Sequence, residues 1–198
     1  MIPLLIIMES VHNFVKEITK GRDESHGYAH MKKVQEIACK FATEMNFPIW
    51  DVSLVAILHD VADAKYDING VNYLAIKEFL DPFLANTYGS ETTDSGIIIK
   101  CIDCISFSKE KREGPRYYED ILLNDYWIKV RNIVSDADKS EALGKIGLDR
   151  CMEYGRQHHA LKEGRELKTS VAKHAAEKIL LLPSYFRTDA GKKICDIR

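Results

Sequence analysis

The stretch Val52-Ser53-Leu54-Val55-Ala56-Ile57-Leu58-His59-Asp60-Val61-Ala62-Asp63 decides how this chain folds and where its chemistry lies. Its apolar run predicts a buried helix, and the run ends in an imidazole next to a carboxylate. Both groups cost free energy to bury unless a partner compensates them, and a divalent metal ion suits both. The end of this helix is therefore the first candidate for a functional site.

Apolar residues recur at helical spacing elsewhere in the chain, and no stretch shows the alternation of a strand. The pattern predicts helices over residues 7–18, 30–45, 71–84, 94–105, 127–134, 142–154 and 170–182. Asp51 is the expected cap of the helix quoted above. Residues 106–115 are polar and basic and end in a Gly-Pro pair, which predicts a loop. The expected fold is all-α, a bundle of non-parallel helices.

Length and composition are those of an ordinary globular domain. The chain has 198 residues, and we expect a single domain over 1–198 because linkers and repeats are absent from the sequence. A net charge of −2 gives no general attraction to nucleic acid or to an anionic membrane, and no apolar run is long enough to span a bilayer. The expected partner is a small molecule. Monomer and homodimer both stay open, because the apolar stripes of a core and of a dimer look alike.

The chain has five cysteines, an odd number that disfavours a disulfide framework and favours reduced thiols in the cytoplasm. Cys101 and Cys104 form a Cys-x-x-Cys pair within an expected helix. Because no second pair completes a four-sulfur zinc site, we interpret both as core cysteines.

Two histidines upstream match the imidazole of the opening stretch. His30 lies four residues before Val34, so the two share an apolar helix face and the imidazole points inward. His26 lies four residues before His30, near the start of the same helix. Both histidines are therefore candidates for a common site with His59.

Three aspartates are candidates for the same site as these histidines. Asp63 lies four residues after His59, and Asp60 converges on the same point from about 100° of helix rotation away. Asp136 follows another expected helix, and helix bundles build internal metal sites from such positions on facing helices. The order along the chain is His, then His-Asp, then Asp.

The candidate metal ligands combine nitrogen and oxygen without a thiolate: His30, His59, Asp60 and Asp136. Such a set suits an octahedral Mn, Fe(II), Co, Ni or Mg ion better than a structural zinc, and neutral imidazoles favour Mn over Mg. We expect one divalent ion with positions left for water and substrate. Asp63 is the candidate to orient or deprotonate that water.

Each of these residues also has a simpler interpretation. A single histidine on an apolar helix face is most often a hydrogen-bonded core residue. Asp136 or Asp138 would equally cap a helix that starts near Lys139. The metal site is the interpretation that explains all of the residues together, in this order and with each pair at a helix end.

Several blocks of the sequence resemble the HD-domain metal-dependent phosphohydrolase superfamily, in its subgroup of small stand-alone hydrolases. The similarity covers most of the chain. The blocks are Ser25-His26-Gly27-x-x-His30-x-x-Lys33-Val34, Leu58-His59-Asp60-Val61-Ala62-Asp63-x-Lys65-Tyr66, Ile105-Ser106-Phe107-Ser108, Val134-x-Asp136-Ala137-Asp138-Lys139-x-Glu141-Ala142-Leu143-Gly144-x-Ile146-Gly147, and a C-terminal part from Lys173-His174 to Gly191-Lys192.

The resemblance implies an all-α HD-domain helical bundle and metal-dependent hydrolysis of a phosphate ester or anhydride. In similar small bacterial proteins the implied substrates are nucleotides, including nucleoside triphosphates cut to monophosphate and pyrophosphate. The family pattern gives the metal ligands as His30, His59, Asp60 and Asp136. It places His26 beside the metal, touching phosphate or water, and Asp63 near the attacking water.

Cationic side chains are needed to neutralise phosphate charge, and the candidates are Lys65, Lys139 and His26. Lys33 stands where many relatives carry Arg, and Lys lacks the planar two-pronged contact of a guanidinium. The charged stretch 109–113 is either a solvated surface loop, which we favour, or a flap over the phosphates. His158 and His159 lie in a polar stretch and are expected at the surface, so one metal ion is favoured over two.

Two other functions use the same residues. A nucleotide-binding regulatory module would keep the metal site with little catalysis, and the intact ligand set argues against it. An oxygenase of the diiron HD-fold type would need more ligands than this sequence offers. We therefore favour a metal-dependent phosphohydrolase that acts on a small nucleotide.

Overall fold

The computed structural model describes residues 4–23, 26–67, 69–87, 94–144, 147, 149, 173 and 179–197. All regular elements in these ranges are helices, which confirms the all-α class. In chain order they are α1 (Leu4–Ile18), α2 (Tyr28–Glu44), α3 (Ile49–Leu58), α4 (Val71–Thr87), α5 (Ser95–Asp103), α6 (Phe107–Glu113), α7 (Glu119–Leu122), α8 (Asp125–Glu141), the 3-10 helix η1 (Ile179–Tyr185) and α11 (Asp189–Ile197).

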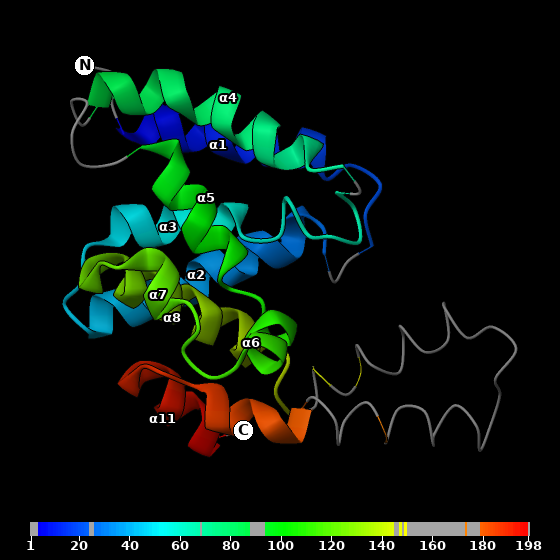
Figure 1. The fold of residues 1–198 in the computed structure, drawn as a ribbon, viewed down its shortest axis with the longest axis vertical. Helices are drawn as coiled ribbons and strands as arrows, with labels where there is room; N and C mark the ends of the chain where they lie inside the picture. Colours follow the sequence, from blue (N-terminus) through cyan, green and yellow to red (C-terminus); the bar gives the residue numbers. More distant parts are fainter. Residues whose placement is uncertain are drawn as a thin grey trace, which may run out of the picture.

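The helices are stacked from one end of the molecule to the other (Figure 1). α1 and α4 lie side by side at one end, where the rings of Phe14 and Phe79 stack 4.4 Å apart. α2, α3 and α8 pack on one another in the middle, and α5 runs down onto α3. η1 and α11 form the opposite end, where α11 packs against α8 and α2. The middle layer is thus covered on both sides.

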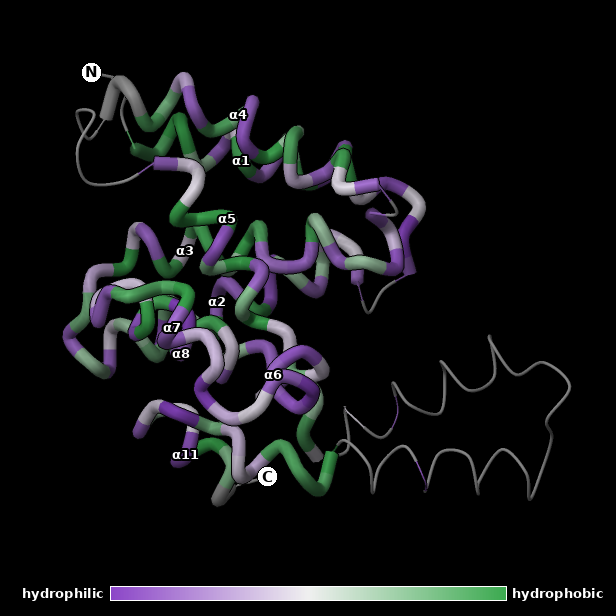
Figure 2. Tube along the Cα trace, in the orientation of Figure 1, coloured by the Kyte–Doolittle hydropathy of each residue, from purple (hydrophilic) through white to green (hydrophobic). Residues whose placement is uncertain are grey.

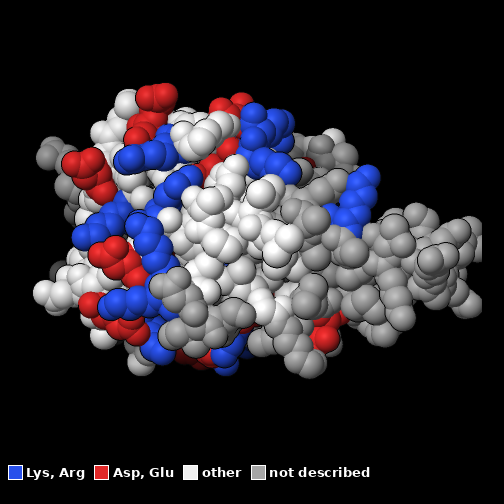
Figure 3. Space-filling model, turned by 90° about the horizontal axis from the view of Figure 1, so that it is seen from below, with Lys and Arg blue, Asp and Glu red and all other residues white. Residues whose placement is uncertain are grey.

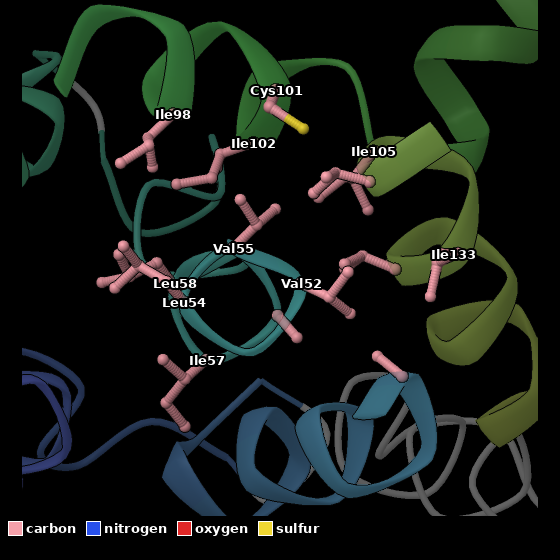
Figure 4. Close-up of a cluster of buried hydrophobic side chains, with 14 of the residues drawn as sticks. Val52, Leu54, Val55, Ile57, Leu58, Ile98, Cys101, Ile102, Ile105 and Ile133 are labelled. Carbon is pink, nitrogen blue, oxygen red and sulfur yellow. The ribbon is translucent and has the colours of Figure 1, made fainter. Parts of the chain in front are cut away.

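α3 is the centre of the core because it is apolar on almost every side. From Val52 to Leu58, all residues except Ser53 are buried. Figure 4 shows Val55 directed toward Ile102 of α5, while Val52 lies on the side of α8. Each such side chain contributes about 1.5–3 kcal/mol of burial free energy, so α3 can lie only inside the bundle.

The distribution of hydropathy follows this arrangement. Figure 2 shows hydrophobic residues along α3 and α5, whereas α6 is largely hydrophilic. Figure 3 shows the end formed by η1 and α11, where charged side chains lie to the left of and above a broad uncharged area. None of the described helices combines the length and the apolarity that crossing a membrane requires.

The prediction of a loop over residues 106–115 is wrong, because most of this stretch is helical. Residues Phe107–Glu113 form α6, which begins after Ser106, whose hydroxyl accepts a hydrogen bond of 3.3 Å from the backbone N–H of Lys109. Phe107 and Glu110 are one helical turn apart and both are buried. The high charge of this stretch suggested a solvated loop, but Phe107 and Glu110 pack one side of the helix into the protein.

Helix boundaries also differ from those expected. α8 continues to Glu141 instead of ending near residue 134, and α4 runs through Pro82. Asp51 does not cap α3, because the helix begins at Ile49; its carboxylate instead accepts a hydrogen bond of 2.5 Å from the Tyr126 hydroxyl. Most of the two helices expected over 142–154 and 170–182, together with His158 and His159, lies outside the described residues.

Candidate metal centre

Two imidazoles and one carboxylate converge from three helices. Nε2 of His30, in the first turn of α2, lies 3.3 Å from Oδ1 of Asp138 on α8. Nε2 of His59, at the end of α3, lies 3.8 Å from the same oxygen. The two imidazole rings are 5.3 Å apart, and both histidines are buried. These atoms are close enough together to share one ion.

The tautomer of His59 is set by its backbone contact. Nδ1 donates a hydrogen bond of 2.8 Å to the carbonyl oxygen of Ala56, and a carbonyl can only accept. The proton is therefore on Nδ1, and Nε2 presents a lone pair to the site. Nε2 is buried and makes no hydrogen bond to any described residue. A divalent metal ion would satisfy that lone pair, so the residues present fit such an ion.

Asp60 and His26 form the next part of the site. Nδ1 of His26 donates a hydrogen bond of 2.7 Å to Oδ2 of Asp60. Nε2 of His26 then accepts one of 3.0 Å from the ammonium group of Lys65. Burial alone would raise the pKa of Asp60, but the hydrogen bond from His26 and the electrostatic interaction with His59 outweigh it and lower that pKa. Asp60 is thus held as a carboxylate, and its ligand atoms group with those of His26 and Asp63 in a cluster separate from that of His30, His59 and Asp138.

The segment after α3 is a series of turns, so His59 and Asp63 do not share a helix as the spacing had suggested. Asp63 accepts a hydrogen bond of 2.8 Å from the backbone N–H of Lys65, which fixes its carboxylate in a local turn. Ligand-type atoms of Asp63, Asp60 and His26 lie within 4.8 Å of one another. Asp63 therefore clusters with Asp60 and His26 and is not part of the group formed by His30, His59 and Asp138.

Arg22 holds this segment in place. Its guanidinium group donates hydrogen bonds of 2.8 and 2.7 Å to the carbonyl oxygens of Asp60 and Val61. It also lies over the ring of Tyr66, 4.6 Å from the ring centroid. The planar fork of a guanidinium matches two neighbouring carbonyls, so Arg22 orients the backbone that carries Asp60.

Asp136 is placed differently from the prediction. Its side chain is fully buried and accepts hydrogen bonds from the backbone N–H groups of Arg187 and Thr188 and from the Thr188 hydroxyl, at 2.7–3.1 Å. These donors lie just before α11, so Asp136 ties α8 to the start of that helix. Burial raises the pKa of Asp136, while Lys139 and the Thr188 hydrogen bonds oppose the rise. It is Asp138, two residues later, that meets the imidazoles.

The lysines predicted to contact phosphate occupy three different environments. Lys139 is buried, and its ammonium group donates a hydrogen bond of 2.6 Å to the hydroxyl of Ser135. Burial and the nearby Arg131 lower the pKa of Lys139 to about 8. Lys33 is exposed on α2 and pairs with Glu36 at 3.7 Å. The structure brings only Lys65 to the edge of the candidate centre.

The sequence analysis did not identify Asp138 or Arg22 as site residues, and only Asp138 could have been found from the sequence pattern. Val130, Val134 and Asp138 follow one another at four-residue intervals, so in an uninterrupted helix they share one face. A prediction that let this helix continue past residue 134 would have directed Asp138 into the core. Arg22 has no comparable signal, because its partners are backbone carbonyls about forty residues away.

Comparisons with known proteins extend along nearly the whole chain, although no protein-family model matches it. The uncharacterized protein YpgQ of Bacillus subtilis (strain 168) is 23% identical over 191 residues, which are 96% of this chain and 85% of that protein. A crystal structure of an HD-superfamily hydrolase from Bacillus thuringiensis has a TM-score of 0.71 at 21% identity, covering 99% of this chain and 90% of that one. The structure of YpgQ in complex with ADP has a TM-score of 0.67 at 21% identity, covering 98% and 88%. These likenesses establish a shared fold.

Proposed function

Because the chain has the fold of the HD-superfamily hydrolases, we propose that it is a metal-dependent phosphohydrolase acting on a small nucleotide. One observation carries the proposal: His30, His59 and Asp138 converge from three helices around the buried Nε2 of His59, which makes no hydrogen bond to a described residue. Two imidazoles and a carboxylate brought together from three helices are the arrangement in which helix bundles hold metal ions.

The ligand set we propose is His30, His59, Asp60 and Asp138, with Asp138 in place of the Asp136 expected from the sequence. Oδ2 of Asp60 accepts the hydrogen bond from His26, which leaves Oδ1 available as a ligand atom. Nitrogen and oxygen ligands suit Mn, and Fe, Co, Ni and Mg are the alternatives. A divalent ion held there would polarise a phosphoryl oxygen and make water nucleophilic near neutral pH.

The surrounding residues have separate tasks in this proposal. The Asp63 carboxylate lies beside the ligands and would orient the attacking water and take its proton. His26 links Asp60 to Lys65 in one chain of hydrogen bonds and would position the Asp60 carboxylate. Lys65 is exposed, and its ammonium group would neutralise phosphate charge at the mouth of the site. Lys33 and Lys139 take no part in this proposal.

A nucleotide is the substrate class that the comparisons favour. YpgQ, which shares the fold over 98% of this chain, has been crystallised in complex with ADP. Phosphate ester and anhydride bonds of nucleotides are also what a mononuclear metal site with a neighbouring carboxylate is suited to hydrolyse. Cleavage of nucleoside triphosphates to monophosphate and pyrophosphate is the specific reaction we propose to test first.

The test is the release of phosphate and of pyrophosphate from a nucleotide panel, with Mn, Co, Ni or Mg supplied in turn. We expect metal-dependent release that disappears in His59→Ala, and pyrophosphate as the product would identify cleavage between the α and β phosphates. His12→Ala is the matched control, because His12 bonds to Tyr28 outside the ligand set and its loss should leave turnover unchanged. Nucleotide binding without any product would instead support a regulatory module.

A further inference from the structure

A polar pocket lies away from the metal centre, where the segment before α7, the middle of α8 and the start of α11 meet. Its volume is about 240 Å³. Its lining residues are Arg116, Tyr118, Asn132, Phe186, Arg187 and Lys192. Three of these side chains are cationic, and the lining includes no carboxylate.

The positive charge of this pocket is only partly compensated. Arg116 pairs with Glu119 at 2.6 Å, and one nitrogen of Arg187 pairs with the buried Glu110 at 2.6 Å. Glu110 is also bound by the fully buried Arg131 at 2.7 Å, so one carboxylate serves two guanidinium groups. Lys192 makes no ion pair with any described residue. An anion entering the pocket would therefore meet a local excess of positive charge.

Two buried polar atoms in the lining have unused hydrogen-bonding capacity. Tyr118 is completely buried, and its hydroxyl makes no hydrogen bond to a described residue. The Nε atom of Arg187 is likewise buried and makes no hydrogen bond of good geometry to a described residue, although the Arg187 guanidinium and the Tyr118 hydroxyl lie close enough to interact with each other. The Tyr118 ring is held by the guanidinium of Arg131, 3.8 Å from its centroid, so the hydroxyl cannot easily turn elsewhere. A bound anion would supply the acceptor oxygens that these two donors lack among the described residues.

The pocket is separate from the metal centre. Asn132 lines it from α8, and Asp138 lies six residues further along the same helix. Six residues correspond to about 240° of rotation and a rise of about 9 Å, so the two side chains leave α8 in different directions. None of the six lining residues is among the proposed metal ligands or their hydrogen-bond partners.

We propose that this pocket binds a phosphate-type dianion, independently of the metal centre. Arg187 and Lys192 supply charge, and the Tyr118 hydroxyl and Arg187 Nε donate hydrogen bonds to its oxygens. A volume of about 240 Å³ is below the range of about 300–1,000 Å³ that drug-sized ligands occupy, so the occupant is inorganic phosphate, pyrophosphate or a small phosphomonoester rather than a whole nucleotide. The proposal stands whether or not the metal centre is catalytic.

The decisive measurement is isothermal titration of the full chain with inorganic phosphate, pyrophosphate and glycerol phosphate, with EDTA present so that no metal contributes. We expect saturable binding of one anion per chain. Lys192→Gln should weaken it about five- to tenfold, because one charge-assisted contact is lost. Lys193→Gln is the matched control, since Lys193 neighbours it on α11 but does not line the pocket, and should change the affinity less than about twofold.

Tyr118→Phe separates a binding site from general charge attraction. It removes one hydroxyl and keeps the ring against Arg131, so the unfolding free energy should not fall, whereas phosphate affinity should fall about threefold or more. Tighter binding of glycerol phosphate than of phosphate would identify a phosphorylated metabolite as the ligand, and the reverse order would identify a free anion. Absence of saturable binding, equal effects of the two lysine variants, or unchanged affinity in Tyr118→Phe would each overturn the proposal.

Discussion

Thr188 donates two hydrogen bonds to a single carboxylate oxygen of Asp136, one of 2.7 Å from its backbone N–H and one of 2.8 Å from its hydroxyl. The same carboxylate accepts the backbone N–H of Arg187. Asp138, on the same helix, instead points toward the two imidazoles. Neighbouring carboxylates of α8 thus have different tasks, one holding α11 and the other facing the candidate metal centre.

This division predicts opposite effects of two alanine substitutions. Asp136→Ala leaves buried backbone donors of residues 187 and 188 unpaired and should lower the unfolding free energy by about 2–4 kcal/mol. Its metal affinity should stay within about threefold of the native value. Asp138→Ala should keep the native stability within about 1 kcal/mol and weaken Mn binding by about 100-fold or more. Urea unfolding and metal titration measure both, and loss of metal binding in the Asp136 variant alone would reverse the assignment.

Asp63→Asn should separate metal binding from turnover. The amide keeps the oxygen that accepts the Lys65 N–H, so the turn should persist, but the side chain can no longer take a proton. We expect metal affinity within about threefold and a decrease in kcat of about 100- to 1,000-fold. Full activity of this variant would remove Asp63 from the mechanism.

Arg22→Lys tests whether the backbone after α3 must be held by a two-pronged contact. A lysine keeps the charge but cannot bond the carbonyls of Asp60 and Val61 together. We expect Mn affinity to fall about tenfold, because Asp60 loses its fixed orientation. Arg112→Lys on the exposed face of α6 is the control and should have no effect. Equal metal affinities in both variants would show that the turn holds itself.

Glu110 should make stability depend on pH in the acid range. Burial alone would raise its pKa, but Arg131 and Arg187 outweigh burial and lower it below the ordinary 4.5. Because the folded protein has the lower pKa, the stabilisation is complete above pH 4.5 and is lost as the pH falls through the folded-state pKa.

The corresponding variant is Glu110→Gln, which leaves two guanidinium groups without their carboxylate. It should be less stable by about 3–5 kcal/mol at neutral pH and should show a weaker loss of stability in acid than the native chain. Glu119→Gln removes a partly exposed partner of Arg116 and should cost less than about 1 kcal/mol. Parallel acid-unfolding slopes for the native chain and Glu110→Gln would contradict the role of this carboxylate.

Local sequence patterns were sufficient for the elements whose burial shows in their own residues. α3 is apolar all round, and α2 keeps His30 on the same face as Val34. Local patterns gave a wrong prediction where a helix is stabilised by distant residues. The charged sequence of α6 predicts a loop, but Glu110 is buried in ion pairs with Arg131 and Arg187, which lie 21 and 77 residues further along the chain. No local rule predicts an ion pair at such a separation.

Helical periodicity and residue chemistry are local properties, so the all-α class, the burial of α3 and the kinds of side chain available for a metal ion follow from the order of residues alone. How those side chains are used depends on the packing of the helices. The contacts of α8 with α2, α3 and α11 direct Asp138 toward the imidazoles and Asp136 toward Thr188, and Lys139 is buried. The direction of a helical side chain is fixed by what packs against the helix, and those partners come from remote parts of the chain.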